Sequence, residues 1–196
     1  IGAVAGSLAG AVLLLVRCRH LKTSIQYSGQ WLVYGDITVP VGFLLDPLSL
    51  LMLTIVTAIC FLVQIYSLGY MAGDKGFSRY YAFMSLFAWA MISLTLSSSL
   101  FQLYVFWELV GLSSYLLIGF WYEKFSASEA GKKAFVMTRF GDVAFMIGLL
   151  LVLMHLGNLD ILKINDPTVT AHMAPGLITL SALLIFGGII GKSAQF

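Results

Sequence analysis

The sequence has 196 residues, of which 60% are hydrophobic and only 10% are charged, whereas an average soluble domain is about 25% charged. The mean hydropathy is +0.95 and the formal net charge is only +2. These values exclude a soluble globular protein, and a chain without a polybasic run is a poor partner for nucleic acid. Because Cys18 and Cys60 stand far apart, the sequence predicts neither a CxxC pair nor a zinc or iron–sulfur ligand set.

Six apolar runs, bounded by charged and turn residues, are the predicted membrane spans. A helix rises about 1.5 Å per residue, so about 20 apolar residues cross a hydrocarbon core of about 30 Å. We therefore predict an all-α, polytopic transmembrane helix bundle that forms a single membrane domain over residues 1–196. The predicted spans are about 2–16, 47–68, 80–98, 100–122, 133–154 and 176–196.

The first run is short, and its small residues Gly2, Gly6 and Gly10 repeat every four positions, which lets a second helix approach closely. The aromatic loop that follows is expected at the headgroup interface. Asp46 and Pro47 then favour a helix start, as an N-cap followed by proline at the first helical position. Only Ser97 to Ser99 separate the third and fourth runs, so these helices should be antiparallel neighbours.

The chain begins at Ile1 rather than Met and ends inside an apolar run, so we expect a fragment that is cut at both ends. Lysine and arginine counts weakly favour one orientation. The side with loops 17–46, 97–100 and 155–175 has four such residues, namely Arg17, Arg19, Lys22 and Lys163. The side with loops 69–79 and 122–133 has five, namely Lys75, Arg79, Lys124, Lys132 and Lys133, and is expected to be cytoplasmic.

Four ionisable side chains fall inside predicted spans: Glu108, Arg139, Asp142 and Lys192. A charge at the bilayer centre costs about 2.5 to 3.5 kcal/mol on insertion scales, so such a residue needs a partner, water or a function. These four residues are the candidate site of the sequence.

Glu108 shares a helix face with Tyr104, Gly111 and Tyr115, which together make a polar stripe on an apolar helix. The carboxylate should therefore face protein or water rather than lipid. Its proton occupancy is a candidate functional property, because intramembrane ionisable groups often mark ion paths. The alternative is a glutamate that only joins helices through an ion pair or a hydrogen bond.

Arg139 and Asp142 are three residues apart and lie on one helix face, with Thr138 beside them. Two interpretations remain open for this pair. It either neutralises itself so that a charged helix can insert, or it lines a proton path.

Lys192 follows a glycine-rich segment and precedes Ser193, which indicates that the last helix could be broken around a cavity. Burial favours the neutral amine and a nearby carboxylate favours the ammonium, so a lysine balanced between the two can exchange a proton. From the rise per residue, Glu108 and Lys192 differ in depth by about 10 Å, which allows a pair between them. The alternative is a lysine that extends to the membrane surface from a helix that ends near Gly188.

Five segments carry a specific resemblance to a known family: LDPLSLLML at 45–53, GFSRYYAF at 76–83, YVFWELVGLSSYLLIGFW at 104–121, KAFVMTRFGDVAFMIG at 133–148 and GKSAQF at 191–196. They closely resemble the antiporter-like L subunit of proton-pumping NADH:quinone oxidoreductase, respiratory complex I. The resemblance implies that this chain covers about helices 2 to 7 of the family.

The resemblance implies that Glu108, in WELVG, and Lys192, in GKSAQ, form the charge pair of a proton-translocating half-channel. Arg139, Asp142 and Thr138 of the TRxGD motif would support the helix or the path, with Tyr104, Tyr115 and Ser193 around them. The family complex uses NADH, FMN, iron–sulfur clusters and quinone in other subunits, so this chain is expected to hold no cofactor.

The expected partners are the other membrane subunits of complex I, especially a neighbouring antiporter-like subunit, and the lipid bilayer. The expected location is a bacterial inner membrane or an equivalent energy-transducing membrane. One alternative is a subunit of an Mrp-type sodium/proton antiporter or of a related membrane-bound hydrogenase, which shares the motifs. Another is a structural helix bundle without a transport role.

Overall fold

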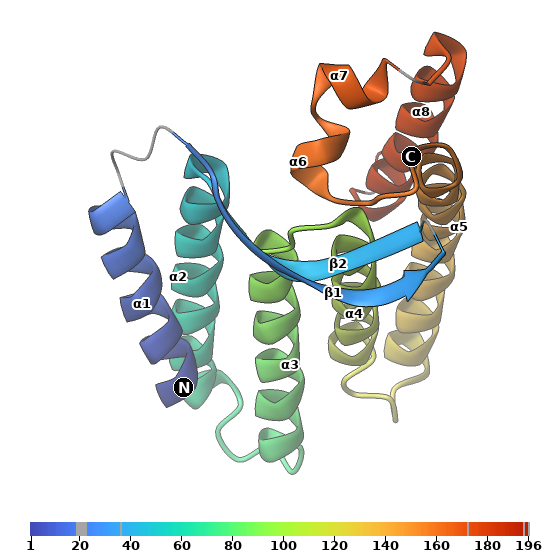
Figure 1. Cartoon of the computed structure of the whole chain (residues 1–196). Helices are drawn as coiled ribbons and strands as arrows, with labels where there is room; N and C mark the ends of the chain where they lie inside the picture. Colours follow the sequence, from blue (N-terminus) through green and yellow to red (C-terminus); the bar gives the residue numbers. More distant parts are fainter. Residues whose placement is uncertain (19–22, 36, 172, 194, 196) are drawn as a thin grey trace.

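In the computed structural model, which describes residues 1–18, 23–35, 37–171, 173–193 and 195, helices run up and down side by side and a β-hairpin crosses one end (Figure 1). Arg19, Lys22, Ala194 and Phe196, which enter the predictions above, lie outside these residues. The elements are α1 (Gly2–Cys18), β1 (Ile25–Tyr34), β2 (Ile37–Leu45), α2 (Pro47–Tyr70), α3 (Phe77–Thr95), α4 (Leu100–Ile118), α5 (Phe125–Leu156), α6 (Ile161–Ile164), α7 (Pro167–Thr170) and α8 (Pro175–Lys192).

The described helices confirm the predicted multi-pass bundle. Four of them, α2, α4, α5 and α8, are long and apolar enough to cross a membrane, and α1 is apolar but shorter. The connections between α2 and α3 and between α4 and α5 lie at one end of the bundle, which we call the loop side (Figure 1). The hairpin, α6 and α7 lie at the other end.

Local sequence signals set the start of α2 and the turn between α3 and α4 as predicted. The side chain of Asp46 accepts a hydrogen bond from the Ser49 backbone N–H at 2.6 Å, and the Ser49 hydroxyl accepts one from the Asp46 N–H at 2.8 Å. Pro47 follows at the first helical position. Ser99 caps α4 through its hydroxyl, and α3 and α4 pack side by side.

The helices differ from the predicted spans most clearly at α5 and α8. Helix α5 begins at Phe125, eight residues before the predicted span, because hydropathy identifies the part that crosses lipid and not the polar turns that extend it. The amphipathic start carries an ion pair between Glu129 and Lys132 at 2.9 Å. Helix α8 is continuous through its glycines and ends at Lys192, so it shows neither the expected break nor an end near Gly188.

The aromatic loop predicted between the first two spans is in fact an antiparallel hairpin. Strands β1 and β2 pair from Ile25 opposite Leu45 to Tyr34 opposite Ile37, and the turn uses Gly35 at a φ of +57°, a conformation that favours glycine. The sequence of β1, IQYSGQWLVY, is rich in the β-branched and aromatic residues that favour strands. Interpreting its aromatic residues only as interfacial anchors hid this signal.

The hairpin is hydrogen-bonded to two distant segments of the bundle. The Leu44 N–H donates to the Leu96 carbonyl at 2.9 Å, and the Thr38 N–H donates to the Gly157 carbonyl at 3.2 Å. The Gln26 amide donates to the Asp160 carboxylate at 2.6 Å. These bonds join the hairpin to the turn before α4 and to the segment after α5.

Helix α4 itself holds β2 through Gln102, whose buried side-chain oxygen accepts a bond from the Gly42 N–H at 2.9 Å. We predict that Gln102→Ala lowers the free energy of unfolding by about 1 to 3 kcal/mol, because it leaves a buried N–H without a partner. Chemical unfolding of the chain in detergent, followed by circular dichroism, measures this loss. Gln30→Ala, at an exposed position of β1, is the matched control, and equal losses for the two variants would contradict the prediction.

Candidate functional site

Helix α8 packs closely against α5 (Figure 1). A Cβ added at Gly188 would lie 2.8 Å from the Phe145 Cβ, and one at Gly141 would lie 3.2 Å from the Gly191 Cα. Only glycine fits at this spacing, so the glycines of both helices let the two backbones touch. As a result, Lys192 lies beside α4 and α5.

Glu108 of α4 forms an ion pair with Arg139 of α5. The side chains are only partly buried, with 22% of Glu108 and 33% of Arg139 exposed. The guanidinium also lies over the Phe135 ring, 4.3 Å from its centroid. The pair lines an otherwise apolar cavity of about 440 Å³ formed with Val105, Leu109, Leu112 and Phe135. Each charge thus has a partner of opposite sign within an apolar surface.

Asp142 of α5 is 1% exposed, although a buried charge is costly unless it is paired or hydrogen-bonded. Its Oδ1 accepts a hydrogen bond of 2.7 Å from the Trp107 indole N–H. Its Oδ2 lies 3.8 Å from Arg139 Nη1 and has no hydrogen bond. Arg139 therefore lies between two carboxylates, those of Glu108 and Asp142, and the predicted proximity of Arg139 and Asp142 is present.

Lys192 approaches α4 at the residue next to Glu108. Its Nζ donates a hydrogen bond of 2.6 Å to the Trp107 carbonyl and lies 5.0 Å from the centroid of the Trp107 ring. A Cβ at Gly111 would be only 2.8 Å from Nζ, so the absence of a side chain there makes room for the ammonium. Among the described residues, no carboxylate lies within 4.0 Å of Nζ.

The structure brings all four predicted ionisable residues into one cluster, but it divides them differently from the expected pair. Glu108 contacts Arg139, whereas Lys192 contacts Trp107. Trp107 joins the two halves, because its carbonyl binds Lys192 and its indole binds Asp142. We call these five residues the charged cluster: Trp107, Glu108, Arg139, Asp142 and Lys192.

The other predicted residues surround this cluster in different ways. Tyr104 packs edge-on against Phe145, with ring centroids 5.4 Å apart, and Phe145 packs in the same way on Trp107. The Thr138 hydroxyl donates back to the Phe135 carbonyl at 2.9 Å. Ser193 caps the end of α8 through its backbone N–H, and among the described residues its side chain makes no hydrogen bond to the cluster.

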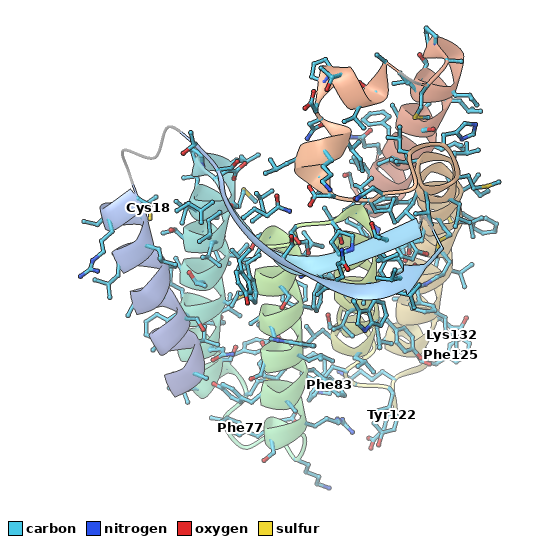
Figure 2. The ribbon with its side chains drawn as sticks, viewed as in Figure 1. Cys18, Phe77, Phe83, Tyr122, Phe125 and Lys132 are labelled. Atoms are coloured by element: carbon cyan, nitrogen blue, oxygen red, sulfur yellow. The ribbon has the colours of Figure 1, made fainter. Side chains whose placement is uncertain are left out.

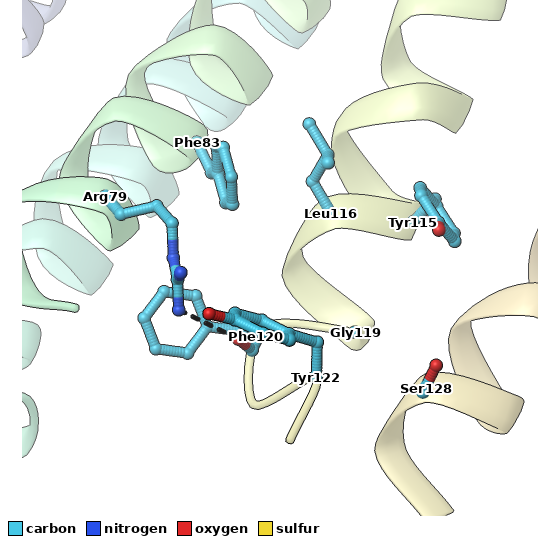
Figure 3. Close-up of a pocket in the computed structure, with 8 residues that line it drawn as sticks. All are labelled: Arg79, Phe83, Tyr115, Leu116, Gly119, Phe120, Tyr122 and Ser128. Atoms are coloured by element: carbon cyan, nitrogen blue, oxygen red, sulfur yellow. Dashed lines mark hydrogen bonds between the residues drawn. The ribbon is translucent and has the colours of Figure 1, made fainter. Parts of the chain in front are cut away.

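A cavity of about 270 Å³ reaches Lys192 from between α4, α5 and α8. A second cavity, of about 220 Å³, opens at the loop side between α3, α4 and α5 (Figure 3). Tyr115 lines both the loop-side cavity and the one that contains Lys192. The first cavity is also lined by the polar residues Ser114 and Thr138.

Aromatic side chains hold Arg79 at the mouth of the loop-side cavity. Its guanidinium lies 4.9 Å from the centroids of both the Phe120 and Tyr122 rings and donates to the Phe120 carbonyl at 3.2 Å (Figure 3). Tyr122 and Phe125 are exposed at this end of the bundle (Figure 2), as aromatic residues at a membrane interface commonly are.

The sequence analysis did not identify Trp107, Arg79 or Phe120 as part of the site. Trp107 directly precedes Glu108, and this position next to an intramembrane carboxylate was the sequence signal that could have placed Trp107 in the site. No sequence signal indicated that Arg79 would contact Phe120, which is 41 positions away.

The described residues contain no group of three or more histidine, cysteine, aspartate or glutamate side chains placed to hold a metal ion. Both cysteines are free, with Cys60 buried in α2 and Cys18 at the end of α1. These residues therefore do not fit an iron–sulfur ligand set, which needs several thiolates.

Residues 97–196, which contain the whole charged cluster, match the family model described as NADH:quinone oxidoreductase/Mrp antiporter, TM. The chain belongs to this membrane family. Residues 31–81 also match the model for the N-terminus of NADH-ubiquinone oxidoreductase (complex I) chain 5. The recognition made from the sequence motifs is confirmed by both matches.

Two curated relatives are chain 5 subunits of NAD(P)H-quinone oxidoreductase. The subunit from Synechocystis sp. is 44% identical over 171 residues, which cover 85% of this chain and 25% of the relative. The chloroplastic subunit from Anthoceros angustus is 42% identical over 175 residues, which cover 87% of this chain and 24% of the relative. The chain therefore spans about a quarter of the length of these relatives.

Two solved structures show the same fold. The Mrp complex from Dietzia sp. matches with a TM-score of 0.81 and 25% identity, over 97% of this chain and 20% of that chain. The archaeal membrane-bound sulfane sulfur reductase matches with a TM-score of 0.78 and 18% identity, over 95% of this chain and 37% of that chain. Chains from two different membrane complexes thus share this arrangement of helices.

Asp74, in the loop-side connection before α3, provides a pH test of the loop-side structure. The Trp121 indole N–H, at 2.9 Å, and the Gly76 N–H, at 2.6 Å, donate to its carboxylate, and these bonds hold the pKa of Asp74 below its usual range. A depressed pKa adds stability above about pH 4, and this stability is lost as the pH falls through the lowered pKa.

We predict that Trp121→Phe weakens this loss of stability in acid, because the pKa of Asp74 then returns toward its usual value. Melting temperatures measured at pH 6, 4 and 3 report the difference. Trp89→Phe, which changes an exposed tryptophan on α3, should keep the wild-type pH dependence. Identical pH dependence in wild type and Trp121→Phe would refute the prediction.

Proposed function

We propose that this chain is a proton-translocating membrane part of an NADH:quinone oxidoreductase and that Lys192 carries the translocated proton. The observation that supports this most directly is the environment of the Lys192 ammonium. It lies inside the helix bundle at a cavity, and its only hydrogen bond among the described residues goes to a neutral carbonyl. A lysine without a tight carboxylate partner can release and regain a proton, whereas one locked in an ion pair holds it.

The proposed relay is electrostatic and passes through Arg139. Glu108 and Arg139 form one ion pair, and Arg139 lies 3.8 Å from the second carboxylate, that of Asp142. When Glu108 loses its charge or is drawn to a neighbouring group, the guanidinium becomes free to move toward Asp142. The negative charge that Asp142 presents to Lys192 is then reduced, and the ammonium releases its proton.

The energy available to such a switch is sufficient for proton transfer. Two unit charges 4 Å apart interact by about 4 kcal/mol at an effective dielectric constant of about 20, whereas a tenfold change in a proton equilibrium requires about 1.4 kcal/mol. The 3.8 Å between Arg139 Nη1 and Asp142 Oδ2 is close to the 4 Å used in this estimate. Glu108 and Lys192 can thus act as the predicted relay pair without direct contact.

Protons would reach Lys192 from the loop side. Arg79 lines the loop-side cavity, Lys192 lines the second one, and Tyr115 lines both. Ser114 and Thr138 offer hydroxyl groups that can hold water in the second cavity. The loop side carries the larger number of lysines and arginines, which is the expected cytoplasmic bias. Re-protonation of Lys192 from this side would complete the cycle.

The chain would work without a redox centre of its own. NADH, FMN, iron–sulfur clusters and quinone would belong to other subunits, and electron transfer there would drive the change at Glu108 through a neighbouring antiporter-like subunit. The assembly would lie in a bacterial inner membrane or an equivalent energy-transducing membrane. The relatives from a cyanobacterium and a chloroplast are in keeping with this proposal.

A second candidate is a subunit of an Mrp-type sodium/proton antiporter or of a related membrane-bound hydrogenase. The structural match to the Mrp complex favours it, because the same charged cluster could then be driven by an ion gradient. Purification of the native complex separates the two functions. An iron–sulfur and quinone-binding arm would support the first, and its absence from an active complex would support the second.

Lys192→Ala tests the proposed function. In vesicles that contain the complete assembly, we expect this variant to lose proton pumping and to slow electron transfer, because the relay has no carrier for the proton. Pumping and electron transfer are measured in parallel with a pH-sensitive dye and by NADH oxidation. Lys163→Ala, on the exposed surface of α6, should behave as wild type.

Glu108→Gln separates a relay from a structural pair in the same assay. A relay requires the carboxylate to change its charge, so pumping should fall while the complex still assembles. Full pumping by Lys192→Ala would overturn the proposal, and full pumping by Glu108→Gln would leave Glu108 as a residue that only joins helices.

Gly111→Ala is a milder change, next to the Lys192 ammonium. Its methyl group would meet the flexible end of Lys192, so we expect proton pumping to fall severalfold while thermal stability stays equal or rises, since alanine favours a helix over glycine by about 1 kcal/mol. Gly69→Ala, which has open space in α2, is the control that should change stability alone. Equal pumping in both variants would contradict this role for the space at Gly111.

A further inference from the structure

We infer that Trp107 is a positioning residue that holds the Asp142 carboxylate in place within the charged cluster that contains Lys192. The inference rests on the proposed proton relay and adds a residue that the relay needs. Trp107 contacts both charged groups, one through its side chain and the other through its main chain.

Asp142 depends on Trp107 for its hydrogen bonding. Its carboxylate is almost completely buried, and the Trp107 indole N–H is its only hydrogen-bond donor among the described residues. The second oxygen, Oδ2, has no hydrogen bond. A carboxylate can accept about four, so the position of this one depends on a single bond of 2.7 Å.

The Trp107 ring is itself held in place by its neighbours. Phe145, which is 2% exposed, packs edge-on against the Trp107 ring at a centroid distance of 5.5 Å. The Lys192 ammonium lies 5.0 Å from the centroid of the same ring, a distance at which a cation is attracted to an indole. The ring is thus fixed by packing and by a cation, and it presents its N–H in one direction.

Without the hydrogen bond from Trp107, the Asp142 carboxylate would be free to move toward another partner. The nearest cation within salt-bridge distance is Arg139, at 3.8 Å from Oδ2. A carboxylate released from Trp107 would move toward this guanidinium, which can donate five N–H groups. Asp142 would then form a permanent pair with Arg139, and changes at Glu108 would no longer reach Lys192.

Trp107→Phe is the direct test, carried out in the complete assembly in vesicles. This change keeps an aromatic ring against Phe145 and keeps the backbone carbonyl that binds Lys192, and it removes only the N–H donor. We expect normal assembly and a loss of proton pumping of about tenfold, the effect of removing a hydrogen bond to a charged group. Trp121→Phe removes the same type of bond, from indole to aspartate, at the loop side, and should leave pumping at neutral pH unchanged.

Two further variants distinguish positioning from general packing. In an Asp142→Asn background, Trp107→Phe should cause little additional loss, because the negative charge that Trp107 positions is already absent. Trp107→His, which keeps a ring N–H, should recover part of the pumping. Multiplicative losses in the double variant, or a histidine variant that pumps no better than the phenylalanine variant, would overturn the inference.

The outcome also separates this inference from the proposed function. Full pumping by Lys192→Ala would remove the relay and the inference together. Loss of pumping by Lys192→Ala with normal pumping by Trp107→Phe would leave the relay in place and show that Trp107 does not position it.

Discussion

The contact between α5 and α8 is the constraint on which the candidate site depends. Glycines on both helices allow the backbones to approach until Gly141 lies against Gly187 and Gly191. Larger residues at these positions would separate the helices, and Lys192 would then lie away from Trp107 and from the cavity between α4, α5 and α8. The polar chemistry of the site therefore rests on an apolar packing detail, which is the usual way in which membrane helices associate.

The charged cluster holds four ionisable side chains whose formal charges cancel inside an apolar helix bundle. Two carboxylates, one guanidinium and one ammonium give a formal charge of zero, although no two of them form an isolated, fully neutralised pair deep in the bundle. Arg139 is shared unequally between Glu108 and Asp142, and Lys192 lies against a carbonyl and an aromatic face. Such an arrangement gives the cluster no net formal charge, and in the proposed relay it leaves the Lys192 proton without a tight carboxylate partner.

Sequence reasoning identified the membrane bundle, the start of α2 and the ionisable residues inside spans, because hydropathy, capping and charge are properties of short segments. It did not identify Trp107, since the bond between its indole and Asp142 joins residues 35 positions apart. Depth along the helices only allowed a contact between Glu108 and Lys192, because depth does not include the direction in which a side chain points. The hairpin was missed because its aromatic residues are equally typical of an interfacial loop.

The hairpin also has a consequence for the order in which the chain can be completed during synthesis. Strands β1 and β2 can pair early, but the bonds from Thr38 to Gly157 and from Gln26 to Asp160 join segments more than a hundred residues apart. At about 5 to 20 residues per second, the ribosome needs roughly 6 to 24 seconds to supply the partner segment. During that interval α2 to α5 are synthesised while the hairpin lacks these partners, so a chaperone or translocation machinery that shields the hairpin would raise the yield of folded protein.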